Sequence, residues 1–216
     1  MKNFNETSAK IAEYLLQIKA IKINTKDPFV WASGIQSPIY TDNRKTLSYP
    51  QIRTFIRQEF VKLINEGFTA PDMIAGVATG GIPFGVIIAQ ELGLPFIYVR
   101  STEKKHGLSK NIEGDFESGK KVIVVEDLIS TGSSSLKVVN LLQEHGCIIN
   151  GLVSIFNYDL KISVSNFNKA KIKTASLTNF DALIEKAIET NSILPSDKKQ
   201  LLDWHKNPEK WQPQTN

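Results

Sequence analysis

The sequence predicts an α/β fold built on a doubly wound parallel sheet flanked by helices, and three observations lead to this prediction. Strand-like and helix-like stretches alternate along the chain, without an internal repeat or a low-complexity linker. Residues 122–125 (VIVV) form a β-branched run, as expected of a strand buried on both faces of a parallel sheet. Polar, glycine-containing loops follow several apolar runs, and ligands of such sheets bind beyond the carboxyl ends of the strands.

The N-terminal part of the chain predicts two helices separated by extended structure. Residues 5–20 carry apolar side chains at helical spacing and predict an amphipathic helix. Residues 28–40 contain Gly34 and Pro38, so short extended pieces joined by turns are expected. Residues 50–66 predict a helix, because a proline suits its first position and a glycine follows its last.

The rest of the chain alternates short apolar runs with helical patterns. The strands are recognised by β-branched and aromatic residues, and the helices by their length and apolar spacing. Strands are expected at residues 73–78, 95–99, 122–125, 148–156 and 172–176, and helices at residues 82–92, 134–145, 181–190 and 196–205. Helices placed between strands favour parallel pairing, since a parallel connection needs a crossover.

Composition is compatible with one domain over residues 1–216. No run approaches the roughly 18 apolar residues of a membrane span, and Glu6 and Glu13 interrupt the N-terminal segment, so neither a membrane anchor nor a signal peptide is expected. The net charge of +4 is not gathered in long blocks, so nucleic acid is not required as a partner. The single cysteine, Cys147, excludes a disulfide within the chain and suits a reduced, cytoplasmic setting.

Residues 120–135, KKVIVVEDLISTGSSS, predict a site for a phosphorylated sugar. The hydroxyl and glycine residues fall where a helix should begin, and a helix N-terminus attracts phosphate. Glu126 and Asp127 would repel a phosphate, so they suit sugar hydroxyls or Mg²⁺ held through water. An ordinary strand-to-helix turn with a serine cap would explain Ser133 or Ser134 but not the adjacent carboxylates.

Two further loops follow expected strands. In residues 76–85, GVATGGIPFG, the main chain at Thr79 and Gly80 could approach an anionic group without Cβ clashes, although glycines that serve only helix packing are the alternative. Residues 100–114, RSTEKKHGLSKNIEG, combine many basic side chains with few apolar anchors. Such a run is often just a solvated face, but its place after a strand suits a mobile lid over a polyanion.

The acid pair and the loop after it resemble the binding motif for 5-phosphoribosyl 1-diphosphate (PRPP) in the type I phosphoribosyltransferases. The loop at residues 76–85 matches the position of that family's diphosphate-binding loop. Some members have a lysine where Gly80 stands here, so any diphosphate contact would come from the main chain. The PRPP-binding residues implied by the resemblance, besides those of the basic loop, are Thr79, Gly80, Glu126, Asp127, Leu128, Ile129, Ser130, Thr131, Gly132, Ser133 and Ser134.

Two other stretches resemble one branch of that family, the orotate phosphoribosyltransferases. The spacing of Arg100, Lys104 and His106, followed by IEG, is similar to their flexible catalytic loop. Residues 29–44, FVWASGIQSPIYTDNR, would alone be read as hydrophobic core and turns, but they resemble the signature that lies over the base pocket. The resemblance implies a catalytic, PRPP-binding role for Arg100, Lys104 and His106, a catalytic role also for Asp127, and orotate binding by Ser130, Tyr40 and Arg44. Basic residues of some members are replaced here by Ser101, Ala32 and Tyr158.

The resemblance implies a fold with a core at about residues 46–177 and a small N-terminal hood, residues 1–45 with part of the C-terminus, over the base pocket. It implies transfer of a phosphoribosyl group from PRPP to orotate, with Mg²⁺ held mainly by PRPP and water near the acid pair. A homodimer whose residues 100–114 reach the neighbouring site is also implied. The alternatives are transfer to another base and a PRPP-sensing regulator without turnover. In the tail, Trp211 favours docking on the body over disorder.

Overall fold

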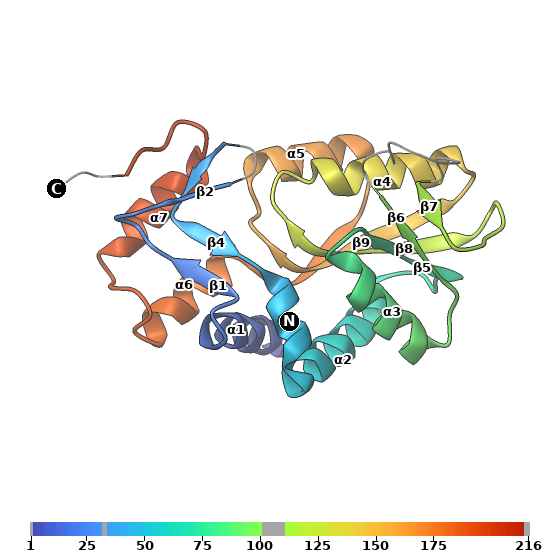
Figure 1. The fold of residues 1–216 in the computed structure, drawn as a ribbon, viewed down its shortest axis with the longest axis horizontal. Helices are drawn as coiled ribbons and strands as arrows, with labels where there is room; N and C mark the ends of the chain where they lie inside the picture. Colours follow the sequence, from blue (N-terminus) through green and yellow to red (C-terminus); the bar gives the residue numbers. More distant parts are fainter. Residues whose placement is uncertain (1, 32–33, 101–110, 214–216) are drawn as a thin grey trace.

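The computed structural model describes residues 2–31, 34–100 and 111–213 (Figure 1). Helices lie on both faces of a six-stranded sheet, and two small two-stranded sheets lie at one end of it. The elements are α1 (Lys2–Gln17), β1 (Ile21–Ile23), β2 (Phe29–Val30), β3 (Gln36–Ser37), β4 (Ile39–Thr41), the 3-10 helix η1 (Asn43–Ser48), α2 (Pro50–Gly67), β5 (Met73–Val77), α3 (Gly81–Leu92), β6 (Phe96–Val99), β7 (Ile112–Glu113), β8 (Lys121–Ile129), α4 (Ser133–Glu144), β9 (Ile148–Asn157), α5 (Lys161–Ala170), β10 (Thr174–Asn179), α6 (Phe180–Glu189) and α7 (Asp197–Lys206).

The large sheet has the order β10-β9-β8-β5-β6-β7, with β7 antiparallel to β6 and every other pair parallel. From β5 the chain moves outward to β6 and then returns to β8 on the other side of β5. This reversal makes the β5–β8 boundary a topological switch point, where ligands of such sheets bind. The doubly wound, mostly parallel sheet predicted from the sequence is confirmed.

The helices form two layers. In Figure 1, α4 and α5 lie on one side of the sheet, and α1, α2 and α3 lie on the other. Successive β8 side chains enter the two cores alternately: Val122 and Val124 pack with Val138 of α4, whereas Ile123 and Val125 belong to the core beneath α2 and α3. A strand covered on both faces has no solvent-facing row, which explains the uninterrupted β-branched run.

Two strands differ from the predicted bounds. Strand β8 extends beyond residues 122–125 to Ile129, because β9 continues beside it as far as the pair Ile129↔Asn157. The acid pair therefore lies within the last part of the strand and not after it. Strand β10 covers residues 174–179 instead of 172–176 and continues directly into α6.

Several short elements and one helix were absent from the prediction. The sequence of α5, KISVSNFNKA, contains two β-branched residues, two asparagines and two serines, which are not strong helix formers, so its helical signal is weak. Its buried Phe167 anchors it on the α4 side of the sheet. Helix α1 ends at Gln17 rather than residue 20, because the chain turns there into β1, which pairs with β4.

Aromatic side chains join the N-terminal strands to the end of the large sheet. The Trp31 ring lies 4.9 Å from that of Tyr158 and 5.6 Å from that of Trp204, measured between centroids. Trp204 of α7 donates from Nε1 to the carbonyl of Gln36 at 3.0 Å. Trp211 of the tail packs against the same core, as predicted from the sequence.

Among the described helices, none is both long and apolar enough to cross a membrane.

Candidate active site

The loop after β5 lies directly against the acid pair at the end of β8. The Ala78–Thr79 peptide is cis, and α3 begins at Gly81. A Cβ atom built on Gly80 would overlap the carboxyl group of Asp127. Glycine is therefore required at this position for the loop and the carboxylate to be neighbours. The structure thus places the loop after β5 against the acid pair, at the carboxyl ends of neighbouring strands.

Glu126 and Asp127 have different surroundings despite being adjacent. Glu126 is 6% exposed, and both of its carboxyl oxygens accept hydrogen bonds: Oε1 from the Asp127 N–H at 3.0 Å and Oε2 from the Ser135 hydroxyl at 3.2 Å. Burial, reinforced by the Asp127 carboxylate, raises the pKa of Glu126 well above its usual value. Asp127 is half-buried beside Gly80, and burial raises its pKa as well. Asp127 is thus the more exposed of the two carboxylates.

The loop between β8 and α4 leaves the first turn of α4 available to an anion. Gly132 adopts φ 76°, in the left-handed region, and accepts a hydrogen bond from the N–H of Leu136 at 2.9 Å. Its cap position carries no side-chain hydrogen bond, so the serine cap considered from the sequence is not seen in this part of the chain. The contact from the Ser133 N–H to Thr131 Oγ1 is long, at 3.5 Å. The N–H groups of this turn therefore suit a phosphate.

Helix α5 packs against the loop between β8 and α4. A Cβ on Gly132 would lie 2.6 Å from the Phe167 ring, so the ring packs directly under the glycine. Asn166 donates from Nδ2 to the carbonyl of Thr131 at 3.3 Å. Sequence reasoning missed both residues because α5 itself was missed. Their spacing from the loop, more than thirty positions along the chain, leaves no local pattern to detect.

The 3-10 helix η1, which belongs to the N-terminal part of the chain, contacts the acid pair. Asn43 is fully buried and donates from Nδ2 to the Asp127 carbonyl at 2.6 Å. Arg44 is next to it, with Nε 2.6 Å from Asp42 Oδ1, and this hydrogen bond lowers the pKa of Asp42. Arg44 was predicted as an orotate contact, whereas Asn43 was not singled out because its partner is remote in sequence.

Tyr158 is a core residue. It is 1% exposed, its hydroxyl lies 2.8 Å from Thr41 Oγ1, and its carbonyl oxygen lies 2.6 Å from His205 Nε2. Burial raises the pKa of its phenol, so the group is neutral at physiological pH. Where some orotate phosphoribosyltransferases have an arginine, this chain therefore has an uncharged side chain that ties β4 to β9. Tyr40, in contrast, is 41% exposed on β4, beside the ring of Phe29.

Of the basic loop, residues 100–114, the structure describes Arg100 and residues 111–114. Arg100 follows β6, with its guanidinium 5.7 Å from the ring centroid of Tyr98 and Nε 4.0 Å from Glu113 Oε1. Its N–H donates to the carbonyl of Asn111 at 2.9 Å, which closes the base of the loop. Lys104 and His106, together with Ser101 and Ala32, lie outside the described residues.

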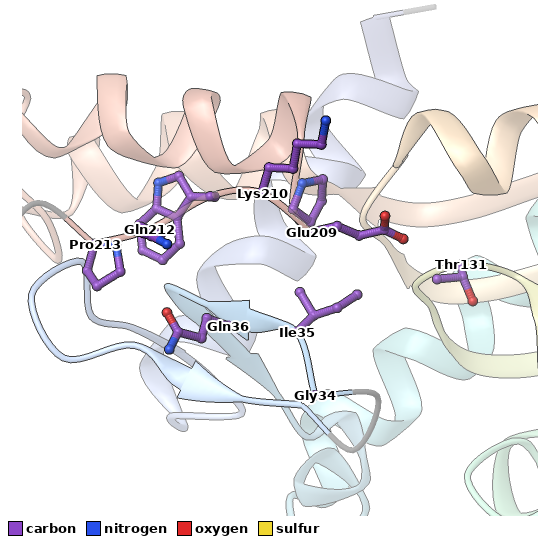
Figure 2. Close-up of a pocket in the computed structure, with 10 residues that line it drawn as sticks. Gly34, Ile35, Gln36, Thr131, Glu209, Lys210, Gln212 and Pro213 are labelled. Atoms are coloured by element: carbon purple, nitrogen blue, oxygen red, sulfur yellow. The ribbon is translucent and has the colours of Figure 1, made fainter.

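A cleft of about 920 Å³ separates the β2–β3 hairpin from the C-terminal tail. Figure 2 shows Ile35 of the hairpin and Glu209 of the tail on opposite sides of this space, with Thr131 of the loop before α4 at its end. The tail therefore lies close to the predicted phosphate loop, a more specific placement than the docking on the body expected from Trp211.

Comparisons with known proteins find similarity to one family. The model of the phosphoribosyl transferase domain family matches residues 47–178. A curated orotate phosphoribosyltransferase from Phocaeicola vulgatus is 49% identical over 201 residues, covering 93% of this chain and 95% of its own.

Solved structures share the fold. That of orotate phosphoribosyltransferase from Aeropyrum pernix superimposes with a TM-score of 0.72 at 26% identity, covering 82% of this chain and 97% of that one. That of the Mycobacterium tuberculosis orotate phosphoribosyltransferase in complex with PRPP gives a TM-score of 0.64 at 21% identity, covering 82% and 98%. The type I phosphoribosyltransferase fold expected from the sequence is thereby confirmed.

Proposed function

This chain belongs to the phosphoribosyl transferase domain family and to its orotate phosphoribosyltransferases, and we propose that it transfers the 5-phosphoribosyl group of PRPP to orotate. The products are orotidine 5'-monophosphate and diphosphate, a step of pyrimidine biosynthesis. The observation that carries the proposal is the meeting of Gly80 with the Asp127 carboxylate at the switch point of the sheet.

We place PRPP across this point. Its 5-phosphate would lie at the loop 130–134, where the first N–H groups of α4 and the hydroxyls of Ser130 and Ser133 can donate. Its ribose would lie over Asp127, whose carboxylate accepts hydrogen bonds from the sugar hydroxyls. Its diphosphate would face the main chain of Thr79 and Gly80.

The harder chemical step of the transfer is the departure of diphosphate from the anomeric carbon. Positive charge grows on the ribose as the bond breaks and negative charge on the leaving group, so electrostatic stabilisation is the main requirement. In our proposal Asp127 orients the ribose and stabilises its growing charge, while Glu126 holds the Asp127 main chain in place. Arg100, Lys104 and His106 neutralise the diphosphate and exclude water that could hydrolyse PRPP.

Mg²⁺ fits the proposed site. Described residues contain no group of three or more potential metal ligands, but Mg²⁺ commonly binds through one or two carboxylates, substrate phosphates and water. Asp127, with Glu126 behind it, and the diphosphate of PRPP provide that set. When bound, the ion would act as a Lewis acid and template for the diphosphate and the ribose hydroxyls.

The base would lie between the end of β8 and the N-terminal hood, residues 1–45. We propose Ser130, Tyr40 and Arg44 as its contacts, with Arg44 and main-chain N–H groups facing the orotate carboxylate. The neutral, buried Tyr158 cannot serve as its cation. Arg44 is more than half exposed, so it can exchange its partner Asp42 for a ligand with little loss of stability.

We further propose a homodimer in which residues 100–114 reach the active site of the neighbouring subunit. The same reading divides the chain into the hood and a core at about residues 46–177 within one domain. A cytoplasmic location is part of the proposal, since the one cysteine is a buried free thiol.

The base specificity is tested by following the loss of base absorbance with PRPP and Mg²⁺, using orotate, uracil, hypoxanthine and adenine in parallel. The proposal predicts a rapid loss of absorbance with orotate and none with the other three bases. Turnover only with another base would contradict the assignment of the hood, and PRPP binding without turnover of any base would favour a regulator.

A further inference from the structure

Asn43 links the N-terminal part of the chain to the acid pair through one buried hydrogen bond. It opens η1, between β4 and α2, and is fully buried. Its Nδ2 donates to the main-chain carbonyl of Asp127 at 2.6 Å, across 84 positions of sequence. A segment outside the six-stranded sheet therefore fixes the main chain of the acid that faces the ligand.

The strand needs this support at Asp127. Strand β5 pairs with β8 only as far as Gly76↔Val125, whereas β9 continues to Ile129↔Asn157. Beyond Val125, β8 has a partner strand on one side only. Asn43 supplies a donor to the Asp127 carbonyl at this one-sided stretch, where β5 no longer pairs with β8.

The orientation of the Asn43 amide follows from its partner. A carbonyl oxygen requires a donor, so Nδ2 faces Asp127. Within the described part of the chain, Oδ1 of Asn43 accepts no hydrogen bond. A buried amide with an unpaired oxygen is less favourable than an apolar side chain of similar size. We therefore attribute the asparagine at this position to the hydrogen bond that it donates to Asp127.

We propose that Asn43 is a positioning residue for phosphoribosyl transfer, because it holds the Asp127 main chain and so sets where the Asp127 carboxylate meets the ribose of PRPP. This inference rests on the proposed function. It adds that the N-terminal hood, which is expected to cover the base, also positions the Asp127 carboxylate near the ribose. A misplacement of about 1 Å can cost roughly 100-fold in rate, so one hydrogen bond can be decisive.

The test compares Asn43→Ala and Asn43→Ser with Thr46→Val. Thr46 is also buried in η1, and its hydroxyl donates to the Asn43 carbonyl at 2.7 Å, so Thr46→Val disturbs the same helix without removing the bond to Asp127. PRPP affinity is measured by calorimetry with Mg²⁺ and without orotate, below each variant's melting temperature. Asn43→Ser keeps a polar side chain in the buried site if Asn43→Ala does not fold. We expect both Asn43 variants to weaken PRPP binding roughly tenfold, equivalent to about 1.4 kcal/mol, and Thr46→Val to change it less than about twofold.

A double-mutant cycle separates positioning from simple destabilisation. If Asn43 acts through Asp127, Asn43→Ser should have little further effect on PRPP affinity in the Asp127→Asn background. Equal losses in both backgrounds, or unchanged affinity in the Asn43 variants, would overturn the inference. Failure of the proposed function is distinguishable from failure of this inference. A protein that binds PRPP but transfers its phosphoribosyl group to no base contradicts the proposed function, whereas the PRPP affinities of the variants test the role of Asn43.

Discussion

At the scale of single residues, the two members of the acid pair have different surroundings. Glu126 has both carboxyl oxygens occupied by protein donors, whereas Asp127 lies against Gly80 at the open end of the strand. From the residue types alone both carboxylates suit sugar hydroxyls or Mg²⁺ held through water, and only the family resemblance singles out Asp127 as catalytic. In the structure Ser135, in the first turn of α4, donates to Glu126 and contributes to the difference between the two acids.

The first prediction follows from this asymmetry. Asp127→Asn removes the negative charge that we propose faces the ribose, so kcat/KM for PRPP should fall by roughly 10- to 150-fold, equivalent to about 1.5–3 kcal/mol for a hydrogen bond to a charged group. Glu126→Gln is the matched control, because a glutamine can still accept from the Asp127 N–H and bond to Ser135. Its loss should be clearly smaller in steady-state kinetics at varied PRPP and Mg²⁺. Equal losses in the two variants would contradict the division of roles.

A second prediction concerns Asp159, whose pKa is raised by burial. The folded state then holds a proton that the unfolded state has released, so this residue's contribution to stability falls as pH rises from the ordinary aspartate pKa of about 4 toward the raised value. Asp159→Asn keeps the left-handed backbone, φ 52°, that asparagine also tolerates. Thermal melts from about pH 4 to about pH 7 should show that the variant gains stability over the wild type as pH rises. The exposed Asp115→Asn serves as control, and a pH-independent difference would refute the prediction.

Local chemistry in the sequence predicts much of the proposed site, but not the contacts around it. Acids, hydroxyls and glycines within a short run predict a phosphorylated ligand, and the structure places Gly80 beside Asp127. Asn43 and Asn166 each bind a main-chain carbonyl far away in sequence. Nothing local distinguishes such an asparagine from one in a turn, because the partner is chosen by the tertiary fold.

At the scale of elements, the start of α4 depends on α5. Gly132 combines a positive φ with the Phe167 ring directly beneath it, so the loop that presents the first N–H groups of α4 is fixed both by its own conformation and by its neighbour. A helix whose sequence propensity is weak thus supports the proposed phosphate site.

The third prediction tests this arrangement with Gly132→Ala. An alanine there pays about 1–2 kcal/mol for the left-handed conformation and also collides with the ring, so both the melting temperature and the PRPP affinity should fall. Gly119→Ala is the control, since Gly119 has φ 86° with open space around its Cβ position. It should lower stability while leaving PRPP binding near normal. Normal PRPP binding by Gly132→Ala would argue against a phosphate at this loop.

The elements themselves were predicted where the periodicity was strong. The five parallel strands of the sheet, β5, β6, β8, β9 and β10, and the helices with a clear apolar face were found. Helix α5 was missed because burial of Phe167, not propensity, makes it a helix. The extension of β8 was missed because the pairing of polar residues depends on β9 lying alongside.

At the scale of the whole molecule, the proposed site is assembled from distant parts of the chain. The loops after β5 and β8 meet at the switch point, η1 approaches from the N-terminal side, and the tail lies across the cleft from the hairpin (Figure 2). In our proposal a second subunit supplies residues 100–114, so the dimer would be the catalytic unit.

The fourth prediction tests that unit. Lys104→Ala and Asp127→Asn should each have strongly reduced activity alone, because each damages every site of its own dimer. In mixed dimers one site combines an intact acid with the partner's intact loop, so equal mixing should restore about a quarter of wild-type activity if subunits exchange at random. Mixing each variant with itself is the control. No recovery despite demonstrated subunit exchange would contradict a shared site.

The central claim, transfer of a phosphoribosyl group to orotate, is tested most directly by measuring the products. PRPP, orotate and Mg²⁺ are incubated with the protein, and orotidine 5'-monophosphate and diphosphate are quantified by chromatography and mass spectrometry. Our account predicts that both products form in equal amounts, each matching the orotate consumed. Release of ribose 5-phosphate with no nucleotide product, or persistence of both substrates, would contradict it.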